Sequence, residues 1–148
     1  MEFNDLIQEF AKRYNIEGLD IEDGVSVLDI DGIAVTLVNV DDIQFVATAE
    51  IGEPPVEGRA DFAEMLLATN MKTQSFFAKN EDSGNYVAIR RMPLAGLDAD
   101  KLDSELEDLI NLTETWRRLL EDFRPVAAEA AAAAEEEPAF GVSGFMQV

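Results

Sequence analysis

The dipeptide Asp31-Gly32 lies between two runs that are rich in β-branched residues, VSVLDI and IAVTLV. A two-residue hairpin turn of type I′ needs a positive φ at both central positions, and Asp-Gly adopts that geometry at little cost. The pair therefore predicts two antiparallel strands joined by a tight turn. A second turn at residues 40–42 leads into IQFVATAEI, where every second side chain from residue 43 to residue 51 is apolar. This alternation is typical of a strand with one buried face, so we expect three consecutive antiparallel strands.

Three other segments carry apolar side chains at helical spacing. In FNDLIQEFAKRY the residues that share one helical face are Phe3, Leu6, Ile7, Phe10 and Tyr14. A short second helix is predicted for ADFAEMLLATNM by the spacing of Phe62, Met65, Leu66 and Thr69. The third helix runs from about Asp98 to Phe123 and has a seam at heptad spacing, made of Leu102, Leu106, Leu109, Thr113, Trp116, Leu120 and Phe123. This seam fits a long helix laid across a sheet, and a short coiled coil is the alternative.

A second hairpin is expected between the second and third helices. The runs QSFFAK and YVAIRRM flank the loop NEDSGN, in which Gly84 suits a turn, and Pro93 ends the second run. The predicted order is helix, three strands, helix, two strands, helix. This order indicates an α+β fold, α-β-β-β-α-β-β-α, with a twisted antiparallel sheet flanked by helices.

The last part of the chain differs in composition from the rest. A chain of 148 residues suits one domain, and we expect that domain to occupy residues 1–124. Residues 125–138 are rich in alanine and glutamate and are interpreted as a linker, and residues 139–148 form an apolar C-terminal peptide. This peptide is predicted to dock in an apolar groove through Phe140, Val142, Phe145, Met146 and Val148.

The composition argues against catalysis. The chain has no cysteine and no histidine, which removes thiol nucleophiles, thiolate metal sites and the commonest general base. The acidic stretches DIDG and LDADKLD lack the spacing of a calcium loop. Glycine-rich phosphate loops and nucleophile elbows are also missing from the sequence. We therefore expect no metal, no cofactor and no enzymatic activity.

The charge and hydropathy also restrict the partners and the location. A formal net charge of −20, from 31 acidic and 11 basic residues, disfavours nucleic acid and anionic membranes as partners. The first residues lack the pattern of a signal peptide, and no apolar run is long enough to span a bilayer. We therefore expect a cytoplasmic protein.

Residues 3–123 resemble the type III secretion chaperones of the Tir chaperone (CesT) family. The most specific stretch is MLLATNMKTQSFFAKNEDSGNYVAIRRMPLAGLDADKL. In that family a short helix leads to a strand, an acidic hairpin with glycine, a strand ending in Arg and Pro-Leu, and a long helix with a tryptophan. The residues that carry the resemblance here are Leu67, Asn70, Gly84, Arg90, Arg91, Pro93, Leu94 and Trp116. The opening LIQEFAKRYNIEGL also resembles the first helix of the family.

The resemblance implies a small acidic homodimer in the bacterial cytoplasm, without enzymatic activity. As a class I-type secretion chaperone, it would hold the N-terminal segment of an effector protein in extended form and keep it competent for export. Dimer contacts are expected from the second helix and the next strand, at Phe62, Met65, Leu66, Met71, Phe76 and Phe77. Cargo contacts are expected from the first helix and first three strands, at Phe3, Ile7, Phe10, Val35, Leu37 and Phe45. Each of these cargo positions also fits an ordinary core residue.

The chain departs from the family after the third helix, because many members end soon after it. The apolar C-terminal peptide is interpreted as a placeholder that occupies a groove of its own or a neighbouring protomer until cargo displaces it. Docking to another export component is the alternative. Two other functions stay open for the whole chain. One is an acidic mimic of nucleic acid that inhibits a nuclease or DNA-binding protein through salt-sensitive contacts, and the other is a same-fold protein unrelated to secretion.

Overall fold

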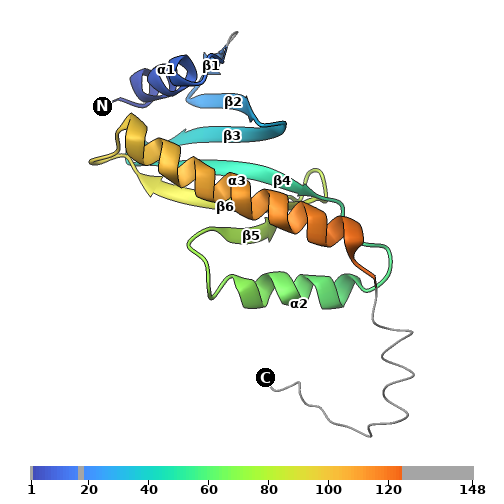
Figure 1. Ribbon diagram of the computed structural model, residues 1–148. Coiled ribbons are helices and arrows are strands. Elements are labelled where there is room, and N and C mark those ends of the chain that lie inside the picture. The colour runs from blue at the N-terminus through green and yellow to red at the C-terminus, as the bar shows by residue number, and fades with distance from the viewer. Residues whose placement is uncertain (1, 17–18, 125–148) are drawn as a thin grey trace, which may run out of the picture.

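The computed structural model describes residues 2–16 and 19–124 of the chain, and these form three helices and six strands. Figure 1 shows their arrangement. In chain order the elements are α1 (Phe3–Arg13), β1 (Ile21–Glu22), β2 (Val25–Ile30), β3 (Ile33–Val40), β4 (Gln44–Gly52), α2 (Arg59–Thr69), β5 (Phe76–Lys79), β6 (Tyr86–Pro93) and α3 (Ala99–Asp122). None of the described helices is both long and apolar enough to cross a membrane.

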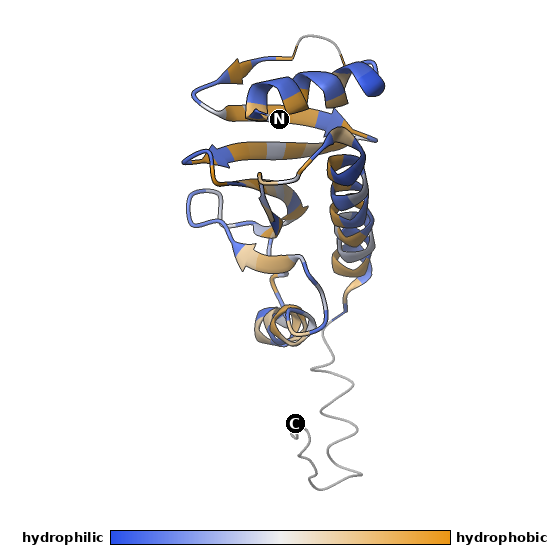
Figure 2. Cartoon of the chain, turned by 90° about the vertical axis from the view of Figure 1, so that its left-hand side faces the viewer, coloured by the Kyte–Doolittle hydropathy of each residue, from blue (hydrophilic) through white to orange (hydrophobic). Residues whose placement is uncertain are grey.

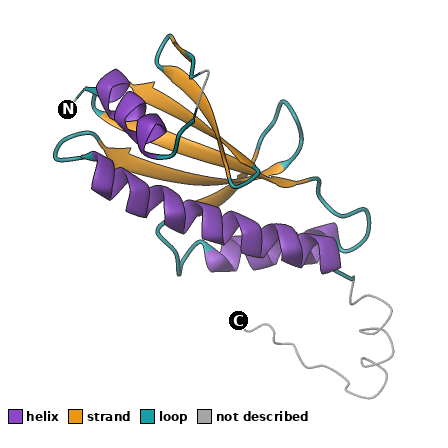
Figure 3. Ribbon diagram, turned by 45° about the horizontal axis from the view of Figure 1, so that its top comes forward, coloured by secondary structure: helices purple, strands orange, loops and turns teal. Residues whose placement is uncertain are grey.

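All six strands belong to one antiparallel sheet with the order β1-β2-β3-β4-β6-β5. Helices α1 and α3 lie side by side on the same face of this sheet (Figure 3). Helix α2 runs along the β5 side of the sheet, at the bottom of Figure 1. The predicted α+β class and the antiparallel sheet flanked by helices are therefore confirmed.

The turn at Asp31-Gly32 has the predicted geometry. Asp31 has a φ of 54° and Gly32 a φ of 82°, and Ile30 pairs with Ile33 directly across the turn. The side chain of Asp29 accepts a hydrogen bond of 3.0 Å from the backbone N–H of Gly32. This bond holds the turn that sets the register between β2 and β3.

Strand β1 was not predicted, and it adds a fourth strand before α2. It spans two residues and pairs with the start of β2, with Ile21 opposite Ser26. The connecting turn is Asp23-Gly24, again with positive φ at both residues, 52° and 73°. The same dipeptide signal as at Asp31-Gly32 was therefore present, but a strand this short shows no alternation in sequence.

The core lies between the sheet and the two helices on its covered face. Side chains of β4 alternate as predicted, with Phe45, Ala47, Ala49 and Ile51 buried. Leu102, Leu106, Leu109, Thr113 and Trp116 of the α3 seam are also buried, and α3 packs mainly on β4 and β6. Each large apolar side chain buried there contributes roughly 1.5–3 kcal/mol to stability. The heptad spacing therefore serves a helix laid across the sheet, as predicted, and not a coiled coil within the described part of the chain.

Helix α2 is fixed to the sheet at both of its ends. Near its start, the ring of Phe62 contacts the rings of Tyr86, Trp116 and Phe123, at centroid distances of 5.6, 5.7 and 5.1 Å. At its end, the side chain of Asn70 accepts a 2.7 Å hydrogen bond from the backbone N–H of Phe77 in β5. These contacts hold α2 beside the edge strand and create the groove described below.

Candidate protein-binding site

One face of the sheet has no helix over it among the described residues. On β2, β3 and β4, side chains that point away from α1 and α3 are exposed or half-buried, because successive residues of a strand face opposite sides. Positions that pair between neighbouring strands form two rows across this side of the sheet. We call these two rows the open sheet face. The first row is Val27, Thr36, Thr48, Ile89 and Phe76, and the second is Val25, Val38, Val46 and Arg91.

The open sheet face is largely apolar although the protein is strongly acidic. Val27 is 58% exposed and Val25 is 38% exposed, and the valines at 38 and 46 are half-buried. The one charged residue of the two rows is Arg91, whose guanidinium lies over the ring of Phe76 at 5.6 Å. Figure 2 shows how hydrophobic residues dominate the strands. Such a surface is suited to a partner with apolar side chains.

The β1 edge of the sheet is also open among the described residues, whereas at the β5 edge the side chain of Asn70 already accepts a hydrogen bond from the backbone N–H of Phe77. Strand β1 pairs only with β2, and β5 pairs only with β6. An edge strand has unpaired backbone N–H and C=O groups on its outer side, and an extended peptide can bind there by adding a strand. The open sheet face and the β1 edge together can therefore receive a segment that has no fold of its own.

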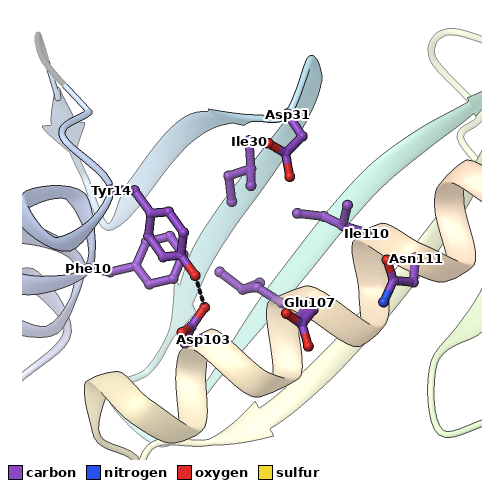
Figure 4. Close-up of a pocket in the computed structure, with 9 residues that line it drawn as sticks. Phe10, Tyr14, Ile30, Asp31, Asp103, Glu107, Ile110 and Asn111 are labelled. Carbon is purple, nitrogen blue, oxygen red and sulfur yellow. Dashed lines mark hydrogen bonds between the residues drawn. The ribbon is translucent and has the colours of Figure 1, made fainter.

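A small cavity of about 210 Å³ opens between α1, the β2–β3 turn and α3. Figure 4 shows its lining, with Phe10 and Tyr14 on one side and side chains of α3 on the other. The apolar side chains of the lining belong to Phe10, Ile30, Leu106 and Ile110. The polar side chains, besides Tyr14, belong to Asp31, Asp103, Glu107 and Asn111.

The electrostatics of this cavity are set by contacts between α1 and α3. The hydroxyl of Tyr14 donates a hydrogen bond to Asp103, which is the main reason why the pKa of Tyr14 is raised to about 12, with burial and the charges of Asp103 and Glu107 adding to it. Arg13 pairs with Asp100 at 2.9 Å, and that contact raises the pKa of the Arg13 guanidinium. A phenol with this pKa stays protonated at neutral pH. The apolar and acidic side chains of its lining make the cavity suited to binding an apolar or cationic side chain.

A second hollow, of about 310 Å³, lies between α2 and the strands β5 and β6. We call it the α2–β5 groove. Its apolar lining includes Ala63, Leu66, Leu67, Phe77, Ala78 and Tyr86. The charged side chains in its lining are Arg59 and Lys79, which are both cationic.

The six positions expected to contact cargo all lie in the core. Their exposed fractions are 3% or less, for Phe3, Ile7, Phe10, Val35, Leu37 and Phe45. They face α1, α3 and each other; the rings of Phe3 and Phe45, for example, are 5.4 Å apart. A buried side chain has no free surface for a partner, so in this structure the accessible residues of the same strands are those of the open sheet face.

The positions expected at a dimer interface divide into two groups. Phe62, Leu66 and Phe77 are buried in the protomer itself. Met65 is 41% exposed, Met71 is 91% exposed and Phe76 is half-buried on the open sheet face. The linker and the C-terminal peptide, with their docking residues, lie outside the described part of the chain.

Three solved structures with the same fold come from complexes of two proteins. The chain is 25% identical to a chain in the ExsC–ExsE complex, with a TM-score of 0.70 over 79% of this chain and 92% of that one. It is 18% identical to a chain in the HopA1–SchA chaperone–effector complex, with a TM-score of 0.66 over 78% and 93% of the two chains. It is 16% identical to a chain in the ExoU–SpcU complex from the type III secretion system of Pseudomonas aeruginosa, with a TM-score of 0.64 over 79% of this chain and 99% of that one. The latter two likenesses support the fold alone.

The sequence comparisons agree with this fold. No curated protein sequence matches the chain significantly. The model of the Tir chaperone protein (CesT) family matches residues 5–117, from α1 into the second half of α3. This match covers well over half of the sequence and includes the covered and open faces of the sheet. The chain therefore belongs to the Tir chaperone protein (CesT) family.

Proposed function

We propose that this protein is a class I-type type III secretion chaperone, which binds the N-terminal segment of an effector in extended form and keeps it competent for export. The observation that carries the proposal is the open sheet face, an apolar surface that ends at the unpaired edge of β1. An extended segment can place alternate side chains on this face and pair its backbone with an edge. The proposed location is the bacterial cytoplasm, and no catalytic step is part of the proposed role.

The comparisons support this role. The HopA1–SchA structure is a chaperone–effector complex, and the ExoU–SpcU complex belongs to a type III secretion system. Both share the fold of this chain, and the CesT family match covers the elements that form the open sheet face.

The net charge is also consistent with a protein that carries exposed apolar surface. Unpaired edges and apolar sheet faces favour association between copies. A formal net charge of −20 makes copies repel one another and opposes aggregation. The proposed chaperone can therefore keep its apolar surface available for cargo.

The proposal includes a homodimer. The exposed Met65 and Met71 lie at α2 and just beyond its end, and methionine side chains adapt readily to a partner surface. Two protomers joined through this region would each contribute one open sheet face. A single extended segment could then contact both.

Co-expression with the product of the neighbouring gene, followed by size-exclusion chromatography with light scattering, tests the proposal. We expect a complex of two protomers and one segment that persists at high salt, because apolar contacts are not screened. A complex with a folded basic protein that dissociates steeply with salt would instead identify an acidic mimic of nucleic acid.

The open sheet face is tested by Val27→Glu, with Val56→Glu as a matched control. Val27 is 58% exposed on the open sheet face, whereas Val56 is 94% exposed in the segment before α2, so both variants should fold. Removing a buried valine contact costs about 1.5 kcal/mol, which corresponds to a rise of about tenfold in the Kd of the segment. We expect this rise, or a larger one, for Val27→Glu alone in isothermal titration calorimetry. An equal Kd for the two variants would exclude the open sheet face as the binding surface.

A further inference from the structure

The second row of the open sheet face continues onto β1. Glu22 lies opposite Val25 in the register of β1 and β2, and cross-strand partners point to the same side of a sheet. The turn at Asp23-Gly24, with positive φ at both residues, holds β1 in this register. The full row is therefore Glu22, Val25, Val38, Val46 and Arg91.

The two ends of this row carry opposite charges. Glu22 and Arg91 are both exposed, and neither takes part in an ion pair within the described residues. The three valines between them are exposed or half-buried. The row is thus an apolar strip with a carboxylate at its β1 end and a guanidinium at its β6 end. We call it the bipolar row.

A hollow of about 460 Å³ opens at the acidic end of the bipolar row. It is lined by Asp20, Glu22, Asp23, Val25, Ser26 and Val27. A lysine or arginine side chain suits this lining, because its aliphatic part can cover the valines while its charged end meets the carboxylates. At the other end of the row, Arg91 can donate hydrogen bonds to a carboxylate.

The length of the bipolar row sets the spacing of the residues that it can contact. Neighbouring strands are about 4.8 Å apart, so the four steps from β1 to β6 in the strand order span about 19 Å. An extended chain advances about 3.3 Å per residue, so about six residues cover this length. Every second side chain of such a chain points to the same side.

We propose that the bipolar row binds an extended partner segment in which a basic and an acidic residue lie about six positions apart, with apolar residues at the second and fourth positions between them. The basic residue lies in the hollow beside Glu22, the acidic residue contacts Arg91, and the apolar residues cover the valines. This inference rests on the proposed function and adds the charge pattern of the bound segment.

A second copy of the protein fits the bipolar row less well. A two-fold axis could pair the acidic end of each row with the cationic end of the other. However, the exposed carboxylates of Asp20, Asp23 and Asp29 lie near the row, and they would meet the surface of a molecule with the same net charge of −20. Like charges so placed cost free energy. A short segment brings no such excess of negative charge.

Methyl NMR spectra of the full chain, titrated with synthetic peptides, test this charge pattern. Each peptide is acetylated and amidated, with valines at the third and fifth positions and serines at the others. The first and seventh positions carry lysine and glutamate in the mixed peptide, and two lysines or two glutamates in the other versions. The spectra locate binding at the methyl groups of Val25, Val38 and Val46 and give the Kd of each peptide.

We expect the mixed peptide to bind most tightly, with a Kd about threefold below that of the two-lysine peptide, because exposed ion pairs are individually weak. A general attraction to a protein with a net charge of −20 would favour the two-lysine peptide instead. Moving the glutamate to the sixth position points it away from the sheet, and this advantage should then be lost. High salt should remove the preference, whereas binding through the valines persists.

Arg91→Glu separates the two explanations, with Lys12→Glu as a matched control. Both substitutions change the net charge equally, and Lys12 is exposed on α1, on the covered side of the sheet. We expect Arg91→Glu to reverse the order, so that the two-lysine peptide binds more tightly than the mixed one. Lys12→Glu should keep the order. Glu22→Arg should reduce the advantage of the mixed peptide over the two-glutamate peptide.

Four results would overturn the inference. The first is tightest binding of the two-lysine peptide to the unchanged protein, and the second is the same order of peptides in Arg91→Glu and Lys12→Glu. The third is an absence of shifts at the three valines with a few millimolar peptide. The fourth is a change of these signals on dilution without peptide, because the occupant would then be a second copy.

The proposed function is judged separately, by the complex with the product of the neighbouring gene. If that complex forms while the expected order of peptides fails, the protein still binds a segment, but without selecting its charges. If neither is seen, the proposed function fails as well.

Discussion

Arg90 and Arg91 illustrate how neighbouring residues of one strand serve opposite faces. Arg90 is only 7% exposed; it donates a hydrogen bond of 2.7 Å to Gln74 and pairs with Glu105 of α3. Arg91 lies on the open sheet face, over the ring of Phe76. Because successive side chains of a strand alternate between faces, the sequence predicts that the two arginine side chains point to opposite faces of the sheet. It does not predict which one is covered, because that depends on where the helices pack.

Tyr14 provides a prediction for the contact between α1 and α3. Its pKa is raised from the ordinary value of 10.0 to about 12, chiefly by the hydrogen bond to Asp103. A group whose pKa is higher in the folded state than in the unfolded state stabilises the fold fully at pH values below its unfolded-state pKa. This contribution is lost as the pH rises through its folded-state pKa. The contact should therefore stabilise the protein up to about pH 10 and lose its effect between pH 10 and pH 12.

Tyrosinate absorbance measured against pH checks this prediction. The chain has two tyrosines, so the Tyr86→Phe background leaves Tyr14 as the one phenol that titrates. Asp103→Asn should shift the midpoint back toward 10, and Glu107→Gln should shift it less, because Glu107 acts only through its charge. A midpoint that does not change in Asp103→Asn would contradict the assigned cause.

At the scale of elements, tight turns explain how the first four strands of the sheet follow one another in antiparallel order. Asp23-Gly24, Asp31-Gly32 and Asp41-Asp42 all have positive φ at both residues. The second and third turns were predicted, and the first was missed because the strand before it spans two residues. Turn dipeptides are local signals that can be read from sequence, whereas very short strands are stabilised by their neighbours alone.

The turn at Asp41-Asp42 predicts a pair of substitutions with opposite effects on stability. Asp41 has a φ of 53°, a conformation that glycine adopts freely and alanine does not. Asp41→Gly should raise the free energy of unfolding by about 0.5–1 kcal/mol, and Asp41→Ala should lower it by a similar amount. Both remove the same carboxylate, so the change in charge is matched. Urea unfolding followed by circular dichroism measures the difference, and equal midpoints would show that the turn is not strained at Asp41.

The faces of the strands were harder to predict than the strands themselves. In β2 the residues on the open side include Val25 and Val27, whereas the buried side includes Ser26. Apolar content therefore does not distinguish the two sides of this strand. In β3, Val35 and Leu37, which were expected to contact cargo, lie on the buried side beneath the helices.

At the scale of the whole molecule, the fold and the family were predictable because the order of elements and the motif around Asn70, Gly84 and Pro93 extend over most of the chain. The binding surfaces were not. The open sheet face exists because α1 and α3 both pack on one side, and the α2–β5 groove exists because Asn70 ties α2 to the edge strand. Both depend on packing between distant segments, which a local pattern does not contain.

Nuclear Overhauser effects in a complex with an isotope-labelled effector segment test the central claim most directly. The account predicts contacts from the segment to the methyl groups of Val27, Val38, Val46 and Ile89 on the open sheet face, and no long-range contacts within the segment. A compact fold inside the bound segment, or unchanged methyl signals on this face, would contradict it.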